Sequence, residues 1–239
     1  MLLDFDGTIS QIAPTPEEAR PAPGAREALD ALADAGAVVA VISGRPALEV
    51  SSLVGSRIRY FGLYGLEDQG GPVAPSEETV AALESVLPEI ERAASLVPGS
   101  RVEHKGLHVA VHYRGSPEPD SARRVLLERL RPVAQARRFR VLEGKKVVEL
   151  APERGPTKGD VVLRVAREAR LAAALYAGDD VADLEAFGAL DRLAEDGLTA
   201  LRAAVRHPEA PAGLLEAADL VADGPAAVVA LLGELAARL

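Results

Sequence analysis

The stretch Met1-Leu-Leu-Asp4-Phe-Asp6-Gly7-Thr8 decides how the rest of the sequence is interpreted. Its apolar start predicts a β-strand that ends at Asp4, and Gly7 permits the sharp turn that follows. Two carboxylates at one strand end repel each other unless a cation lies between them, and Mg2+ is a cation that prefers oxygen ligands. The alternative is an ordinary Asp-Gly turn with solvated acids, and the remaining sequence decides between the two.

Helical and strand patterns alternate near both ends of the chain, which is the signature of a doubly wound α/β sheet. Residues 38–42 form a continuous apolar, β-branched run, typical of a strand buried on both faces. The first part is predicted to hold helix 23–35, strand 38–42, helix 48–54 and strand 57–63. The last part is predicted to hold helix 158–170, strand 173–177, helix 181–188, strands 199–205 and 220–222, and helix 225–239.

The middle of the chain follows a different rhythm. A long helix over 75–96 precedes a hairpin of strands 101–105 and 107–114, and a helix over 119–136 precedes a hairpin of strands 138–142 and 145–150. Helix, hairpin, helix, hairpin predicts an α+β unit with an antiparallel sheet. We therefore expect a core of residues 1–71 and 151–239, interrupted by an inserted domain of residues 72–150.

Composition narrows the classes of protein to consider. Of the 239 residues, 48% are hydrophobic and 26% charged, as in a soluble globular protein, and there is no cysteine for disulfide or thiolate chemistry. No apolar stretch approaches the roughly 18 residues of a membrane span, and the N-terminus lacks signal-peptide features, so a cytoplasmic location is expected. The net charge of −9 argues against nucleic acid as a partner.

One segment departs from this acidic balance. Residues 98–146 hold twelve Lys or Arg and five Asp or Glu, a local net charge of +7. The excess can be a solvated helix face, since many of these arginines lie in the predicted helix 119–136. It also suits an anionic small substrate.

Four short segments fall where a strand ends or a helix begins, the place where α/β sheets bind ligands. They are Asp4 to Thr8, Ser43-Gly44-Arg45, Lys158 after Gly-Pro-Thr, and Gly178-Asp179-Asp180-Val-Ala-Asp183. Each alone has an ordinary explanation as a turn or an exposed lysine. Together, five acids, a lysine, a serine and helix N-termini predict a metal-assisted phosphoryl-transfer site.

These segments, in this order, resemble the motifs of the haloacid dehalogenase (HAD) superfamily of aspartate-nucleophile phosphatases. The resemblance implies a HAD-like, Rossmann-like α/β core, with the insertion as an α+β cap of the C2B type. It also implies that Asp4 is the nucleophile and Asp6 the acid/base. Mg2+ is then expected at the Asp4 carboxylate, the Asp6 carbonyl and Asp179, with Asp180 and Asp183 as further ligands or their hydrogen-bond partners. Phosphate binding is expected from Thr8, Ser43, Gly44 and Lys158, the last also counted as catalytic.

The insertion is similar to the cap of trehalose-6-phosphate phosphatases. The similarity rests on residues 102–114, which contain Glu-x-Lys and a downstream Arg, and on Lys-x-x-x-Glu in residues 144–150. It implies sugar binding by Glu103, Lys105, Arg114, Lys145 and Glu149, and we also expect Arg45 to contact the substrate. The alternative is cross-strand ion pairs on a solvated sheet. The chain departs from the family pattern at Ala182, Leu184 and residues 64–71, which leaves the substrate preference open.

Three histidines in the insertion, His104, His108 and His112, are four residues apart. On a helix this spacing would suggest a zinc site. Gly106 and the alternation of apolar residues around Val109 and Val111 instead predict strands, and with them no metal role.

The expected function is Mg2+-dependent hydrolysis of trehalose 6-phosphate through an aspartyl-phosphate, by a monomer without nucleic-acid or membrane partners. Within the enzyme class, the alternatives are sucrose-phosphate, mannosylphosphoglycerate and broad hexose-phosphate phosphatases. From another class, a catalytically silent sugar-phosphate-binding module is the alternative.

Overall fold

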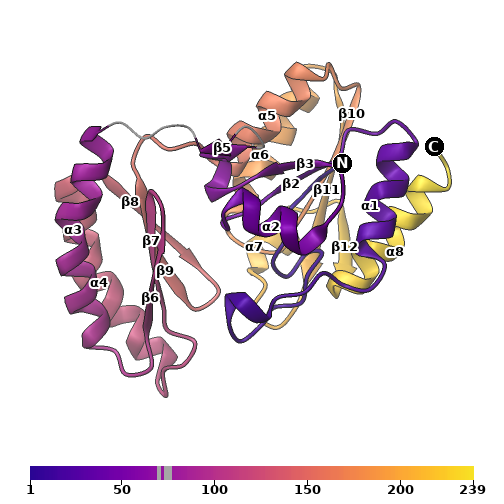
Figure 1. The fold of residues 1–239 in the computed structure, drawn as a ribbon. Helices are drawn as coiled ribbons and strands as arrows, with labels where there is room; N and C mark the ends of the chain where they lie inside the picture. Colours follow the sequence, from indigo (N-terminus) through magenta and orange to yellow (C-terminus); the bar gives the residue numbers. More distant parts are fainter. Residues whose placement is uncertain (69–70, 73–76) are drawn as a thin grey trace. The chain divides into compact units, whose positions relative to one another are not determined.

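The computed structural model describes residues 1–68, 71–72 and 77–239, which form two compact units. Unit 1 comprises Met1–Gly71 and Pro156–Leu239, and unit 2 comprises Pro72–Gly155 (Figure 1). The second strand of the last hairpin in unit 2 runs to Pro152, so this unit extends past residue 150.

A six-stranded parallel sheet forms the centre of unit 1. Its strand order is β12 (Leu220–Asp223), β11 (Thr199–Arg206), β10 (Ala173–Gly178), β1 (Leu2–Leu3), β2 (Ala40–Ile42) and β3 (Arg59–Phe61). The strands β2 and β3 are added in order on one side of β1. After the insertion, β10 lies on the other side of β1, and β11 and β12 are added outward from it. The order of the strands therefore reverses between β1 and β10, where open α/β sheets bind their ligands.

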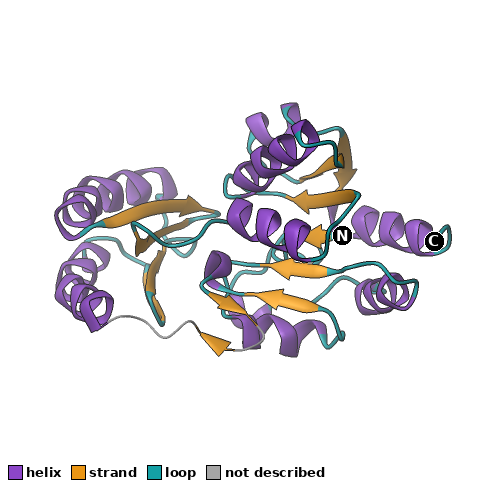
Figure 2. Ribbon diagram, turned by 90° about the horizontal axis from the view of Figure 1, so that it is seen from above, coloured by secondary structure: helices purple, strands orange, loops and turns teal. Residues whose placement is uncertain are grey.

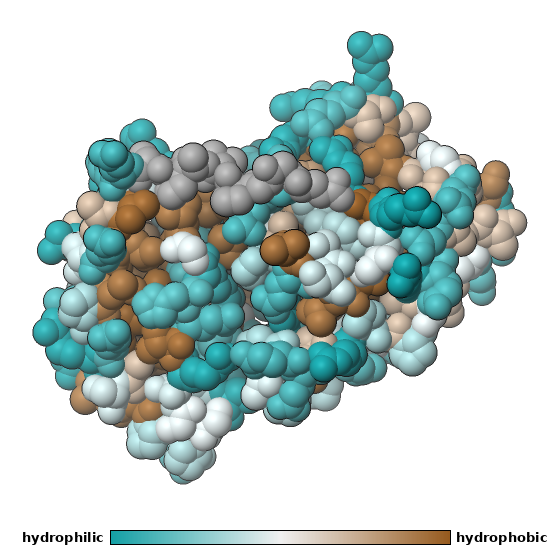
Figure 3. Space-filling model, viewed as in Figure 1, coloured by the Kyte–Doolittle hydropathy of each residue, from teal (hydrophilic) through white to brown (hydrophobic). Residues whose placement is uncertain are grey.

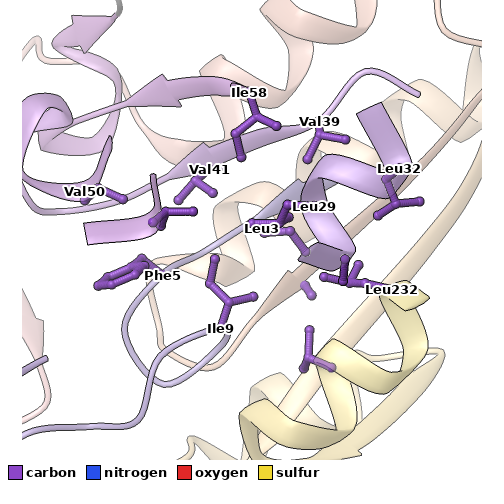
Figure 4. Packing of buried hydrophobic residues seen from close by; sticks show 14 of the residues in the cluster. Leu3, Phe5, Ile9, Leu29, Leu32, Val39, Val41, Val50, Ile58 and Leu232 are labelled. Atoms are coloured by element: carbon purple, nitrogen blue, oxygen red, sulfur yellow. The ribbon is translucent and has the colours of Figure 1, made fainter. Parts of the chain in front are cut away.

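Helices cover both faces of this sheet (Figure 2). They are α1 (Ala25–Asp34), α2 (Ala47–Val54), α5 (Lys158–Glu168), α6 (Asp183–Glu195), α7 (Ala212–Glu216) and α8 (Gly224–Ala236). Successive strand residues point to opposite faces, so Leu3 packs in the cluster formed with α1, α2 and α8, and Leu2 packs with α5, α6 and α7. Figure 4 shows the first cluster, where Leu3, Leu29 and Leu232 meet. This layering confirms the predicted α/β class.

Short elements complete unit 1 and its connection to unit 2. They are the 3-10 turns Pro16–Glu18 and Leu63–Gly65 and the strand pair β4 (Glu67–Asp68) and β5 (Gly71–Pro72).

Unit 2 is a four-stranded antiparallel sheet with two helices on one face (Figure 1). The strand order is β6 (Arg101–Lys105), β7 (His108–His112), β9 (Val147–Pro152) and β8 (Phe139–Gly144), and the helices are α3 (Glu77–Ser95) and α4 (Pro119–Arg137). Apolar residues of the sheet, among them Val109, Val148 and Leu150, pack under the helices. The predicted helix start at Pro75 lies outside the described residues.

Two predicted boundaries were wrong. The turn of the second hairpin is at Lys145 and Lys146 rather than Glu143 and Gly144, because Gly144 pairs with Val147 and Lys146 takes the left-handed conformation. This register keeps the apolar residues of β8 and β9 on the helix face. Helix α6 begins at Asp183 and runs to Glu195, since its later apolar residues are buried in the core.

Hydrophilic residues are spread over the surface seen in Figure 3, with smaller hydrophobic patches between them. Among the described residues, none of the helices has the length and apolar character needed to span a membrane.

Candidate active site

Asp4 directly follows the short strand β1 in the middle of the parallel sheet. Its N–H donates to the carbonyl of Ala177 at 2.9 Å, which extends the pairing with β10 by one residue. The side chain is almost fully buried. The carboxylate therefore lies at the carboxyl end of the sheet, where the strand order reverses.

Lys158 supplies a cation to this carboxylate from the first turn of α5. Its Nζ donates to Asp4 Oδ1 and to Asp183 Oδ1, both at 2.7 Å. The helix start is fixed by Thr157 and Asp160, whose side chains and backbone N–H groups form a reciprocal capping box. Burial alone would lower the pKa of Lys158, but the carboxylates of Asp183 and Asp4 raise it above its usual range. The lysine is thus held in its charged form.

Asp183 is fully buried, and both of its oxygens accept hydrogen bonds. Oδ1 accepts from Lys158 and, at 2.6 Å, from the Tyr176 hydroxyl. Oδ2 accepts from the backbone N–H groups of Asp179 and Asp180, each at 2.8 Å. Burial would raise the pKa of Asp183, yet Lys158 together with these donors lowers it. The side chain therefore ties the lysine to the turn that follows β10.

The close approach of Asp183 to this turn requires glycine at position 178. A Cβ on Gly178 would lie 2.2 Å from Asp183 Cγ. Gly178 is thus needed for packing against Asp183 as well as for the turn.

The carboxylates of Asp4, Asp179 and Asp183 form a buried acidic group. One oxygen from each of the three carboxylates lies within 4.8 Å of one oxygen from each of the other two. Among the described residues, these three are the acidic or histidine side chains that lie close enough together to hold a metal ion. Oxygen donors at this spacing fit a hard divalent cation such as Mg2+. Asp180, in contrast, uses Oδ1 to accept from the N–H of Val181 at 2.7 Å.

Asp6 is held by Arg45 in a two-point contact. Arg45 Nε donates to Asp6 Oδ2 at 2.6 Å and Nη2 donates to Oδ1 at 2.9 Å. The guanidinium also donates to the Pro16 carbonyl at 2.9 Å and pairs with Glu49. Burial would lower the pKa of Arg45, but Asp6 and Glu49 raise it. Arg45, predicted to contact the substrate, here fixes the orientation of Asp6.

Ser43 and Gly44 lie between the end of β2 and the start of α2. Ser43 is buried and its Oγ accepts from the N–H of Arg45 at 3.1 Å. Tyr64, which has the left-handed φ of 59°, donates its N–H to the Ser43 carbonyl, and its hydroxyl lies 2.8 Å from where a Cβ on Gly44 would be. On the other side, the Thr8 hydroxyl donates to Asp4 Oδ2 at 3.5 Å.

The residues expected to bind sugar lie in unit 2, and most are on the sheet face opposite the helices. Glu103 and Lys105 of β6 share this face with Glu149 of β9, because Ala110 of β7 pairs with both glutamates. Lys105 Nζ is 3.2 Å from Glu149 Oε2. Arg114 donates to the carbonyl of Lys145 at 3.1 Å, and Lys145 lies in the turn rather than on the strand with Glu149.

His108 and His112 belong to this network, and their spacing in the sequence did not predict these contacts with the glutamates. His108 Nδ1 is 2.5 Å from Glu149 Oε1, and His112 Nε2 is 2.5 Å from Glu103 Oε2. Burial would raise the pKa of each glutamate, but Lys105 and His108 lower that of Glu149, and His112 and Lys105 lower that of Glu103. Both histidines lie on a strand, as predicted.

His207, after β11, was also missed. Its Nε2 lies 2.9 Å from Asp179 Oδ2. Its position in the sequence could have indicated it, because His207 is the first residue after a parallel strand, as Asp179 is after β10.

Comparison with known proteins identifies the family. Residues 2–213 match the trehalose-phosphatase family. The chain belongs to that family. A trehalose-phosphate phosphatase of Mycobacterium ulcerans is 33% identical over 252 residues, which cover 100% of this chain and 62% of the relative. This member of the trehalose-phosphatase family thus spans about three fifths of the relative's length.

Solved structures show the fold of this trehalose-phosphatase family member. The C-terminal domain of a C. albicans trehalose-6-phosphate phosphatase superposes with a TM-score of 0.85 at 23% identity, covering 99% of this chain and 91% of that one. A HAD superfamily phosphatase from Bacteroides thetaiotaomicron gives a TM-score of 0.60 at 16% identity, with 98% and 92% covered. The predicted HAD-like fold is confirmed.

Proposed function

We propose that the protein is a Mg2+-dependent phosphatase that hydrolyses trehalose 6-phosphate to trehalose and phosphate through an aspartyl-phosphate. The observation that carries the proposal is the buried carboxylate of Asp4, held by Lys158 beside two further carboxylates. An ordinary Asp-Gly turn would leave its acids solvated and unpaired with a buried lysine. Membership of the trehalose-phosphatase family supports the same reaction.

In the first step, an oxygen of Asp4 attacks phosphorus and the bond from phosphorus to the sugar oxygen breaks. Asp6 is proposed to give a proton to the departing alkoxide, and the contact with Arg45 fixes where its carboxyl group lies. To carry that proton, one Asp6 oxygen has to give up its bond from Arg45, because the two-point contact favours the carboxylate. Lys158 offsets the negative charge that builds up where the phosphate dianion meets the carboxylate.

In the second step, water attacks the phosphorus of the aspartyl-phosphate. Asp6, now a carboxylate, takes a proton from that water, and the bond from phosphorus to the Asp4 oxygen breaks. Phosphate leaves and Asp4 is restored. The buried side chains of Ser43 and Thr8, together with Gly44, are proposed to hold the phosphate oxygens during both steps.

The donor set supports a Mg2+ site formed by Asp4, Asp179 and the carbonyl of Asp6. Bound there, Mg2+ would reduce the repulsion between the phosphate and the carboxylates and polarise the phosphoryl group. Asp183 already uses both oxygens for Lys158 and the strand-end turn, which favours a role in holding these groups. The Asp180 side chain accepts from its own turn, which favours a supporting role as well.

The sheet face of unit 2 is proposed to select the sugar as the cap domain. Carboxylates and ammonium groups on one face, such as Glu149 and Lys105, offer a sugar's hydroxyls both acceptors and donors. Glu103, Arg114 and Lys145 are proposed to take part. Sucrose-phosphate, mannosylphosphoglycerate and hexose-phosphate phosphatases remain the alternatives within this class, and we further propose that the protein acts as a monomer.

The test is phosphate release across a panel of sugar phosphates, with and without Mg2+. We expect the highest kcat/KM for trehalose 6-phosphate, and no turnover by Asp4→Asn, because an amide cannot form the intermediate. Near-normal turnover by this variant would exclude Asp4 as the nucleophile. A preference for another sugar phosphate would support one of the alternatives, and no hydrolysis at all would support the silent binding module.

A further inference from the structure

His207 and Asp179 lie at the carboxyl ends of neighbouring parallel strands. Asp179 follows β10 and His207 follows β11, and these strands pair in register up to Gly178 and Ala204. His207 Nε2 is 2.9 Å from Asp179 Oδ2, and the carboxylate is fully buried. The imidazole is 11% exposed, so water has little access to this contact.

The position of the proton on the imidazole follows from its second nitrogen. The backbone N–H of Glu209 donates to His207 Nδ1 at 3.1 Å, so Nδ1 presents a lone pair. In the neutral ring the proton is then on Nε2, whose hydrogen-bond partner is the backbone carbonyl of Asp179 at 3.4 Å. The carbonyl of His207 accepts from the N–H of Ala210 at 3.1 Å, and this turn also fixes the ring's backbone.

The imidazole lies outside the acidic group itself. Within the described residues, the side chains close enough together to hold an ion are Asp4, Asp179 and Asp183, a set without His207. His207 therefore contacts Asp179 but does not itself belong to the set of side chains that could bind the ion. The ring thus bonds the backbone carbonyl of Asp179 and lies against the carboxylate of the same residue, which is the position of a group that orients a metal ligand from outside.

We propose that His207 is a positioning residue for the metal ligand Asp179. The inference rests on the proposed function, since it takes the acidic group to be a Mg2+ site. The hydrogen bond to the Asp179 carbonyl holds the backbone of this residue, and the ring, with Nε2 2.9 Å from Oδ2, limits rotation of the carboxylate about its terminal bond. A carboxylate held in one orientation loses less freedom when it binds an ion.

The experiment measures Mg2+ binding to the full chain by titration calorimetry, without substrate. His207→Leu removes the donor, and we expect its Kd for Mg2+ to rise about tenfold, at the lower end of the effect of losing such a partner. His207→Gln keeps an N–H that can reach Asp179, so its Kd should stay close to that of the unaltered protein. His104→Leu removes an exposed histidine of unit 2 and is the matched control with unchanged Kd.

Long-range 15N NMR of the unaltered protein checks the tautomer independently of any variant. It should show Nδ1 of His207 without a proton and Nε2 with one. The opposite tautomer would overturn the inference, whether or not the His207→Leu variant folds. Thermal melting of that variant in EDTA shows whether it folds.

Two calorimetric results would also overturn it: equal Kd for His207→Leu and the unaltered protein, or equal weakening by Leu and Gln. Equal Kd values would mean that His207 does not affect Mg2+ binding. Equal weakening by both variants would mean that the effect comes from packing and not from the N–H donor. If the unaltered protein binds no Mg2+, the proposed metal site itself fails, and the inference falls with it.

Discussion

At the scale of single residues, the site is a balance of buried charges. Lys158 lies in the first turn of α5, where the helix dipole disfavours a cation, and it is also removed from water. Asp4 and Asp183 offset both costs through short contacts to the same ammonium group. A buried group of this kind tolerates the loss of one member poorly, because the remaining charges stay without compensation.

Asp183→Asn should therefore destabilise the protein by about 3 kcal/mol at pH 7. Because the pKa of Asp183 is lowered on folding, its contribution is present above the unfolded-state pKa of about 3.9 and is lost as the pH falls through the folded-state value. Urea unfolding in EDTA at a series of pH values measures this. The difference between the two proteins should shrink below about pH 4.

Asp219→Asn is the matched control for that series. Asp219 pairs with Arg202 at 2.7 Å on the surface, which lowers the pKa of Asp219 to about 2, and exposed pairs of this kind contribute about 1 kcal/mol or less. A difference between Asp183→Asn and the unaltered protein that does not change with pH would contradict the assigned charge balance.

At the scale of elements, the site depends on how strands end. The turn after β10 brings two backbone N–H groups to Asp183, and this requires the absence of a side chain at Gly178. A Cβ there would overlap the carboxylate, so either the turn or the side chain would have to move.

Gly178→Ala should lower the free energy of unfolding by about 2 kcal/mol through overpacking, and should weaken Mg2+ binding because Asp179 moves with the turn. Gly188→Ala is the control. It lies in α6 with nothing within 4 Å of its added Cβ, so it should be neutral or stabilise the helix by up to about 1 kcal/mol. Urea unfolding and calorimetry compare both variants, and equal effects would contradict the role given to Gly178.

The positions of Asp4, Lys158 and Asp179 could be predicted because each stands at a strand end or helix start in a recognisable order. Tyr176 could not, since it lies within an apolar strand and its hydroxyl finds Asp183 only in the folded chain. The contact of Arg45 with Asp6 is equally non-local. The second hairpin turn was misplaced because Gly144 suits a turn, whereas burial of the apolar face decided the register.

At the scale of the whole molecule, reaction and recognition are proposed to belong to different units. Unit 1 holds the acidic group and Lys158, whereas unit 2 holds the network around Glu149. If this division is correct, a change in the sheet of unit 2 should affect the disaccharide more than a small phosphate ester.

Glu149→Gln should raise KM for trehalose 6-phosphate about tenfold, the effect of losing one charged hydrogen bond, and leave p-nitrophenyl phosphate hydrolysis unchanged. Glu143→Gln is the control, because Glu143 lies on the opposite face of the same sheet and pairs with Arg123 and Arg131 of α4. Steady-state kinetics of both variants on both substrates measure these effects. Equal losses on the two substrates would argue against sugar selection by this face.

The contact between Lys158 and Asp4 joins residues 154 positions apart, and β1 gains its second neighbour, β10, only later still. During synthesis on the ribosome, the segment that carries Asp4 is therefore made well before the cation that balances it. A nascent chain that stops before residue 158 holds Asp4 and Ser43 but neither Lys158 nor Asp179. A chain that stops there therefore lacks the cation that balances Asp4 and the other two carboxylates of the acidic group.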